Sequence, residues 1–211
     1  MIKFAAILLY LFSIFLISIV FKKFNENNSE IVRKIIHIGI GPLIPIAQLL
    51  KIDQSSALIF TGVVSLIVLI NYTYKLFPTI EDVERKSYGT IFYCLSLFIL
   101  IWLFWDKDPY ALIAGFFVMT FGDGLAGLIG KSFNSKNWII FKQKKSLFGT
   151  LTMFLTSLIV VCSIGYAQQK NVNLNYFAIA FLATVLEQFS VLGIDNFIVP
   201  ISSALCFNFF T

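Results

Sequence analysis

The sequence is dominated by long apolar runs, most of them long enough to cross a lipid bilayer as a helix. In the run from Leu147 to Ala167, for example, no side chain is charged. A helix needs about 20 such residues to span the hydrocarbon core. Only helices and closed barrels satisfy their backbone polar groups there, and these runs lack the alternation of barrel strands. We therefore predict an all-α, polytopic transmembrane bundle of about seven or eight helices, forming a single domain over residues 1–211.

Polar connections between the runs give approximate bounds for each predicted helix. The segments are 2–21, 35–50, 55–74, 88–105, 109–130, 147–167, 174–192 and 197–210. Segments 35–50 and 197–210 are shorter than a membrane crossing usually requires. Two interpretations stay open for these two segments: a crossing, or a helix that is re-entrant or buried.

The composition excludes the common classes of water-soluble protein. Hydrophobic residues make up 58% of the chain and charged residues 13%, whereas a soluble domain carries about 25% charged residues. A soluble core of this size cannot bury so much apolar surface. The net charge of +5 does not require a nucleic-acid partner, because excess Lys and Arg in a membrane protein usually reflect its orientation. We expect a lipid bilayer as the surroundings and no nucleic acid.

The basic residues are distributed unequally between the two sides that this layout creates. Four of the sixteen lie on one side, namely Lys3, Lys51, Lys107 and Lys170. The other twelve are Lys22, Lys23, Arg33, Lys34, Lys75, Arg85, Lys86, Lys131, Lys136, Lys142, Lys144 and Lys145. Basic loops stay in the cytoplasm, so the second side is predicted to be cytoplasmic and both termini to face away from it. We expect a bacterial inner membrane, or the thylakoid of a phototroph.

Polar residues inside the apolar segments gather near that cytoplasmic side. A charged group at the bilayer centre costs about 2.5–3.5 kcal/mol, so such residues are candidates for function. Arg33, Lys34 and His37 share one side of a helix, where they could contact a common ligand. Asp123, between two glycines, is hard to explain by packing. The alternative for the first cluster is a basic loop end with a histidine satisfied by a neighbouring helix.

A second basic group precedes the segment that begins at residue 147. Lys144 and Lys145 are followed by Ser146, Gly149 and Thr150, at a helix start where free backbone N–H groups and the helix dipole favour an anion. Phosphate is the ligand that this pattern favours. The alternative is that the lysines only contact anionic lipid headgroups.

Three acidic residues complete the set of candidates. Glu187 and Asp195, together with Asp123, would provide the carboxylate oxygens that Mg2+ shares with substrate phosphates. We therefore predict a magnesium site from these three residues. Capping and loop turns are the alternative, and they explain Asp195 better than they explain Glu187.

Five motifs in the chain resemble the polyprenol kinase family, which includes phytol, farnesol and dolichol kinases and CTP-dependent diacylglycerol kinases. The motifs are RKxxH at 33–37, ERKxYG at 84–89, GDxxAxxxGK at 122–131, KSxxGT at 145–150 and E…GxDN…P at 187–200. They occur in the family's order over nearly the whole chain, and the length and last motif are most similar to phytol kinases. One departure is Leu147-Phe148, where relatives often carry Trp or Glu.

The resemblance implies transfer of the terminal phosphate of CTP to a membrane isoprenoid alcohol, with Mg2+ as cofactor. Asp123 with Glu187 or Asp195 would hold the metal, and the hydroxyls of Ser146 and Thr150, with the backbone near Gly149, would bind phosphate oxygens. The residues expected to neutralise the triphosphate are Arg33, Lys34, Lys131, Lys144 and Lys145. Asp123 and His37 are the candidates for the base. The alternatives are a phosphatidate cytidylyltransferase, a CTP-dependent diacylglycerol kinase and a small-molecule transporter.

Overall fold

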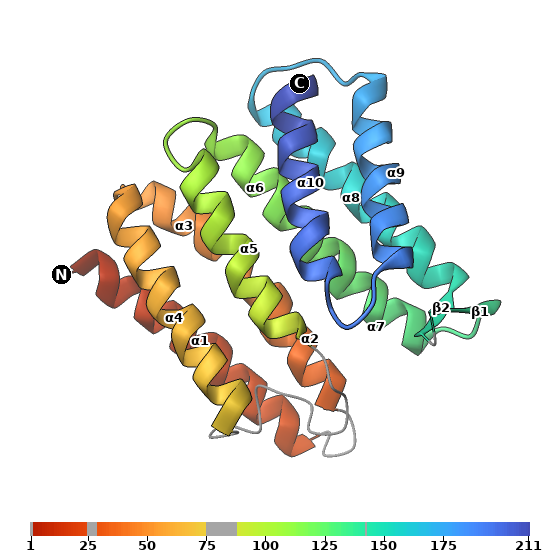
Figure 1. Ribbon diagram of the computed structural model, residues 1–211, viewed down its shortest axis with the longest axis horizontal. Helices are drawn as coiled ribbons and strands as arrows, with labels where there is room; N and C mark the ends of the chain where they lie inside the picture. The colour runs from red at the N-terminus through yellow and green to blue at the C-terminus, as the bar shows by residue number, and fades with distance from the viewer. Residues whose placement is uncertain (1, 25–28, 75–87, 142) are drawn as a thin grey trace.

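The computed structural model describes residues 2–24, 29–74, 88–141 and 143–211, and it is almost entirely helical (Figure 1). Its elements are α1 (Ile2–Phe24), α2 (Ser29–Ile40), α3 (Leu43–Leu49), α4 (Gln54–Tyr74), α5 (Gly89–Phe104), α6 (Pro109–Phe117), the π-helical turn η1 (Val118–Asp123), α7 (Gly124–Ser132), β1 (Asn137–Ile140), β2 (Gln143–Ser146), α8 (Leu147–Ala167), α9 (Leu174–Phe189) and α10 (Asp195–Phe210). The prediction of an all-α bundle is confirmed.

Within the described part of the chain, each of the eight predicted segments is helical, and two of them contain a break or an irregularity. The segment predicted at 35–50 is divided into α2 and α3 at Gly41 and Pro42. Proline lacks the N–H that a continuous helix requires. A Cβ atom at Gly41 would come within 2.7 Å of Thr120 Cγ2, so this turn passes close to η1.

Five helical stretches are long and apolar enough to cross a membrane: Lys3–Lys23, Ile31–Leu49, Gln54–Tyr74, Pro109–Ser132 and Leu147–Ala167. The helices α5 and α9 are shorter but also apolar. Large apolar side chains are exposed along α1, α4 and α8, including Leu9, Ile59 and Ile159. An apolar surface of this extent is typical of helices that face lipid, and it fits a multi-pass membrane protein.

The feature of the fold that matters most for the site is the continuous helix α6–η1–α7. Gly122, Ala126 and Gly130 form a stripe of small residues that faces α8: a Cβ atom at Gly122 would lie 2.8 Å from Met153 Sδ, and one at Gly130 would lie 3.2 Å from Gly149 Cα. The small residues therefore let α7 and α8 pack closely, as small-xxx-small spacing predicts. The π-helical turn ends at Asp123, and such turns occur frequently at functional sites.

A short antiparallel hairpin, which was not predicted from the sequence, follows α7. Trp138 pairs with Lys145, and Asn137 pairs with Ser146. Successive residues of a strand point to opposite faces, so Lys144 and Lys145 face in different directions. The hairpin thereby gives different surroundings to two neighbouring lysines that were predicted to have the same role.

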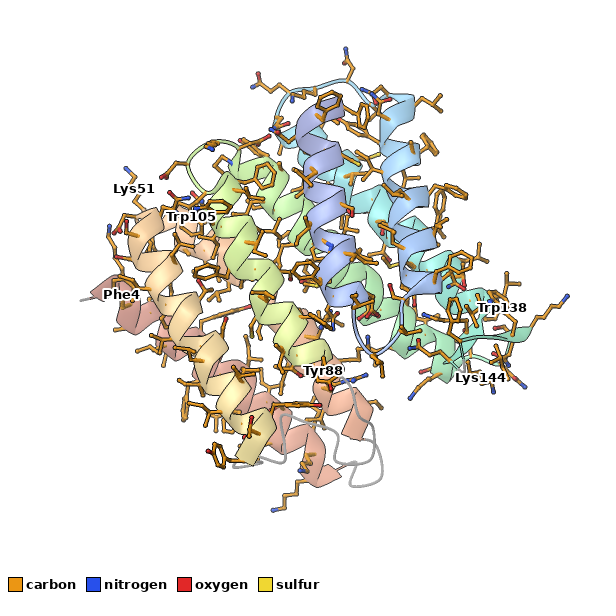
Figure 2. The ribbon with its side chains drawn as sticks, in the orientation of Figure 1. Phe4, Lys51, Tyr88, Trp105, Trp138 and Lys144 are labelled. Atoms are coloured by element: carbon orange, nitrogen blue, oxygen red, sulfur yellow. The ribbon has the colours of Figure 1, made fainter. Side chains whose placement is uncertain are left out.

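The bundle has two ends of different character. At one end, hydrogen bonds join helix ends and loops that are far apart in the sequence. Lys3 Nζ donates to the carbonyl of Lys51, and Gln168 Nε2 donates to the carboxylate of Asp108. At the other end lie the hairpin, the start of α5 and the connection between α9 and α10 (Figure 2, where Trp138, Lys144 and Tyr88 are at this end and Lys51 and Trp105 are at the opposite one).

We expect the two ends to face opposite sides of the membrane. In a chain without native cysteines, Ser135→Cys on the hairpin side and Gln169→Cys at the opposite end should react with an impermeant maleimide from opposite faces of sealed vesicles. The prediction that 75–87 shares the cytoplasm with 131–146 concerns a loop outside the described residues, and Ser87→Cys tests it in the same assay. Labelling of Ser135→Cys and Ser87→Cys from different faces would contradict a single site.

Candidate functional site

One cavity of about 900 Å³ opens at the hairpin end of the bundle, and all of the predicted site residues line it. Its walls come from α2, α5, α7, the hairpin, the start of α8, the end of α9 and the start of α10. The predicted residues on these walls are Arg33, Lys34, His37, Asp123, Lys131, Lys144, Lys145, Ser146, Gly149, Thr150, Glu187 and Asp195. Clusters that are far apart in the sequence therefore form a single site.

Asp123 is the centre of the first group in this cavity. Its carboxylate accepts a hydrogen bond of 2.7 Å from Lys34 Nζ, and its backbone carbonyl accepts a second of 3.0 Å from the same atom. Nε2 of His37 lies 3.5 Å from the same carboxylate oxygen and 3.4 Å from the carbonyl of Met119. The side chains of Lys34 and Asp123 are only 7% and 15% exposed. The group thus holds a cation, a carboxylate and an imidazole together with little water.

Two glycines of α7 make room for this group. A Cβ atom at Gly127 would lie 2.6 Å from Cε of Lys34, and one at Gly124 would lie 2.5 Å from Cγ1 of Ile38. The glycines around Asp123 therefore serve two helix contacts: one face packs on α8 and the other admits α2 with its lysine. The glycine-rich sequence therefore leaves the space that Lys34 needs to reach Asp123.

A second ion pair joins the hairpin to α9. Lys145 Nζ donates to the carboxylate of Glu187 and, at 2.9 Å, to its backbone carbonyl. Both side chains are 11% exposed, whereas Lys144 is exposed at the rim of the cavity. Lys145 is therefore held in a defined position, and its exposed neighbour is not.

Gln188 is a site residue that sequence reasoning missed. Its side-chain amide donates to Thr150 Oγ1 at 2.9 Å and to the Glu187 carboxylate at 2.8 Å, while its oxygen accepts from Trp138 Nε1 at 3.2 Å. It thereby links α8, α9 and the hairpin. A neutral amide beside Glu187 carries little signal in sequence, and only its position one residue after a buried acid could have indicated a role.

Ser146 and Thr150, which were predicted to bind phosphate, also make structural hydrogen bonds at the start of α8. The Ser146 hydroxyl accepts from the backbone N–H of Gly149 at 3.2 Å and donates to the carbonyl of Gly130 at 3.2 Å. Thr150 Oγ1 donates to the carbonyl of Ser146 at 3.0 Å. Ser146 is thus the N-cap of α8, and a phosphate role for both hydroxyls stays a prediction.

The connection between α9 and α10 brings Asp195 and Asn196 into the cavity. The predicted segment 174–192 ends earlier, at Phe189, because Ser190 is extended and Leu192 and Gly193 have positive φ angles of 56° and 87°. Asn196 Nδ2 donates to the carbonyl of Gly89 at 3.0 Å. Burial, followed by the nearby charges of Asp123 and Glu187, raises the pKa of Asp195 to about 6. The three predicted carboxylates therefore influence one another across the cavity.

Tyr93 of α5 is a further residue that was not predicted. Its hydroxyl donates to the carbonyl of His37 at 3.0 Å and lies 3.3 Å from Thr120 Oγ1, and its ring contacts that of His37 with centroids 4.6 Å apart. Among apolar neighbours, a tyrosine is hard to distinguish from a packing residue by sequence. Part of the predicted basic side and most of the motif ERKxYG at 84–89 cannot be compared with the structure, because Lys75, Lys142 and residues 84–87, which include Arg85 and Lys86, lie outside the described residues.

The predicted magnesium site stays a prediction, and it would need oxygen ligands from a substrate. Among the described residues, no three His, Cys, Asp or Glu side chains stand close enough together to hold a metal by themselves. Mg2+ usually needs only one or two protein carboxylates, the rest being water and phosphate oxygens. Asp195 forms no ion pair within the described part of the chain, whereas Asp123 and Glu187 are each paired with a lysine. Asp195, with one of the other two carboxylates, could hold such an ion.

Comparison with known proteins finds relatives that share one name. The chain is 36% identical over 200 residues to the phytol kinase of Synechocystis sp., an alignment that covers 93% of this chain and 86% of that protein. It is 24% identical to a probable chloroplastic phytol kinase of Triticum aestivum, covering 82% of this chain and 65% of the relative. A probable chloroplastic phytol kinase of Glycine max is 30% identical over 58% of this chain and 43% of its own length. No protein-family model matches the chain, and no solved structure matches it significantly.

Proposed function

The chain belongs to the phytol kinase family, and on this premise we propose that it transfers the terminal phosphate of CTP to an isoprenoid alcohol such as phytol. The observation that carries this proposal is the single cavity in which lysines, carboxylates and a helix start meet at one end of an apolar bundle. Phosphoryl transfer requires little beyond positioned reactants and charge stabilisation of the phosphates. The family supplies the acceptor class, and the geometry supports a phosphate chemistry.

The cations of the cavity would bind the triphosphate. Lys131 and Lys145 lie on the α7 and hairpin side, and Arg33 lies on α2, whereas Lys144 at the exposed rim adds only an attraction that water screens. The dipole at the start of α8, beside Ser146 and Gly149, adds further attraction for an anion. When Mg2+ is bound at Asp195 and a neighbouring carboxylate, it supplies charge neutralisation for the phosphates.

Asp123 would position the alcohol. In the transfer, the hydroxyl oxygen forms a bond to the terminal phosphorus, the bond from that phosphorus to the bridging oxygen breaks, and CDP leaves. The hydroxyl proton passes to the Asp123 carboxylate, with His37 as the neighbouring imidazole that stabilises the site. Lys34, held on the same carboxylate, keeps the oxygen oriented and faces the incoming phosphate.

The setting that we propose is an integral membrane one, with the cavity on the cytoplasmic side of a bacterial inner membrane or a thylakoid. The described basic residues support this orientation, because the hairpin end carries most of them. A transporter would place its polar groups near the bilayer midplane, between repeats. The concentration of polar residues at one end favours an enzyme.

The direct test is a reaction with purified protein, phytol, Mg2+ and CTP labelled in its terminal phosphate. We expect labelled phytyl monophosphate and CDP in equal amounts, with less product when ATP replaces CTP. Release of pyrophosphate and attachment of the cytidylyl group would instead identify a cytidylyltransferase. Phosphorylation of diacylglycerol but not of phytol would identify a diacylglycerol kinase, and no phosphorylation of any lipid alcohol would contradict the proposal.

A further inference from the structure

The cavity becomes less polar with depth along α2. Arg33, Ile36, His37 and Ile40 all line it, and they lie on successive turns of one helix face. Seven residues separate Arg33 from Ile40, which corresponds to about 10 Å along the helix axis. The guanidinium therefore stands near the opening, and the isoleucine at 40 stands in the apolar interior of the bundle.

The wall opposite α2 comes from the N-terminal part of α5, which begins at the hairpin end of the bundle. Thr90 and Tyr93 line the cavity there, and Tyr93 is 5% exposed. α2 packs mainly on α1 and α7, whereas α5 packs on α4, α6 and α10. The two helices approach each other through Tyr93 and His37. They thus form the two sides of a compartment with Ile36 and Ile40 on one wall and Thr90 and Tyr93 on the other, Thr90 being the nearer to the opening.

Asp123 stands at the junction between the two parts of the cavity. Lys131 lies about 12 Å from it along the helix axis, two turns nearer to the opening. Asp123 contacts Lys34 and His37 at the level where the lining of α2 changes from charged to apolar. A nucleotide arrives from water and a lipid alcohol arrives from hydrocarbon. The only group that must reach the junction from the apolar side is the hydroxyl.

We infer that the alkyl chain of the acceptor alcohol binds between α2 and α5, against Ile36, Ile40 and Thr90, with its hydroxyl at Asp123. This inference rests on the proposed function. It places the alkyl chain against apolar side chains and away from the lysine-rich side of the cavity. Ile40 lies three residues, or about 4.5 Å along the helix axis, deeper than His37, so the alkyl chain of an isoprenoid alcohol bound at Asp123 passes this side chain. One methylene group in an apolar pocket changes kcat/KM by about 10- to 200-fold.

The first experiment narrows the compartment. Ile40→Trp should lower kcat/KM for phytol by at least about tenfold and should also lower kcat/KM for the shorter alcohol geraniol, while KM for the nucleotide changes less than about twofold. Ile36→Trp should act in the same direction on phytol. The matched control is Ile59→Trp on α4, where the side chain is 68% exposed, and it should leave both alcohols unaffected. An unchanged kcat/KM for phytol, or a raised nucleotide KM, would overturn the inference.

The second experiment needs no turnover. A phytol analogue that carries a diazirine at the end of its chain is photo-cross-linked to the wild-type protein, and the labelled peptides are identified. Label within 31–49 and 89–104 that unmodified phytol competes away supports the inference, and label concentrated on the hairpin or on α8 and α9 overturns it. If the protein phosphorylates no alcohol, the proposed function fails, and the cross-link still decides where a lipid alcohol binds.

Discussion

Replacing Asp123 by asparagine should lower turnover at least about 100-fold, the low end for loss of a catalytic electrostatic or acid–base group. Asparagine keeps the size of the side chain and an oxygen that can accept from Lys34. The ammonium of Lys34 also retains the backbone carbonyl of residue 123, at 3.0 Å. The substitution therefore removes the negative charge while the contact between α2 and α7 remains. The measurement is kcat at saturating nucleotide and alcohol, together with the thermal midpoint in detergent.

Asp108→Asn is the matched control for this prediction. Asp108 lies at the opposite end of the bundle, where its carboxylate caps α6 by accepting from the N–H of Ala111 and also accepts from Asn208. Asparagine caps helices about as well as aspartate, so turnover should change less than about twofold. An Asp123→Asn protein that inserts normally and retains wild-type turnover would exclude Asp123 from the mechanism.

Lys145→Ala should raise the nucleotide KM by at least about tenfold and change the alcohol KM less than about threefold. A hydrogen bond to a charged group contributes about 1.5–3 kcal/mol, and about 1.4 kcal/mol corresponds to a factor of ten. Because Glu187 holds Lys145 at the cavity wall, its ammonium is already in place when the phosphates arrive. The measurement is initial rate against CTP concentration at saturating alcohol.

The neighbouring lysine provides the control. Lys144 is exposed on the other face of β2, so water screens its charge, and Lys144→Ala should raise the nucleotide KM less than about threefold. The two variants remove the same side chain from adjacent positions. Equal effects of both substitutions would indicate a general attraction of anions by the basic hairpin and not a specific contact of Lys145.

The sequence was sufficient to predict the helices and the charged residues that gather in the cavity, whose roles stay predictions, because both follow from the cost of placing polar groups in hydrocarbon. Apolar runs must be helical, and a charge such as Asp123 within a run requires a reason. Each residue selected by this argument lines the cavity. The site residues that were missed, Tyr93 and Gln188, are uncharged, and an apolar helix accommodates them at little cost.

The pairings within the site could not be predicted, since they depend on tertiary contacts. Lys34 and Asp123 are 89 residues apart in the sequence, and neither residue alone indicates that they neutralise each other. The hairpin was missed because β1 and β2 are only four residues long, too short for an alternating pattern to be distinguished from a loop. Its consequence, the separation of Lys144 from Lys145, was therefore also beyond the sequence.

The π-helical turn between α6 and α7 sets the angular phase of the two halves of that helix. Each residue of an α-helix advances the chain by about 100° around its axis, and a π-helical turn holds an extra residue. Before the turn, Gly115 sits against Pro200 and Ala204 of α10. After it, Asp123 faces Lys34. Removing one residue between 118 and 122 would let the turn close into a regular α-helix with both halves near their present phase, whereas a deletion within α6 or α7 would rotate one half by about 100° relative to the other. We therefore expect this helix to tolerate a one-residue deletion at the turn, while the same deletion elsewhere would separate Gly115 from α10 or turn Asp123 away from Lys34.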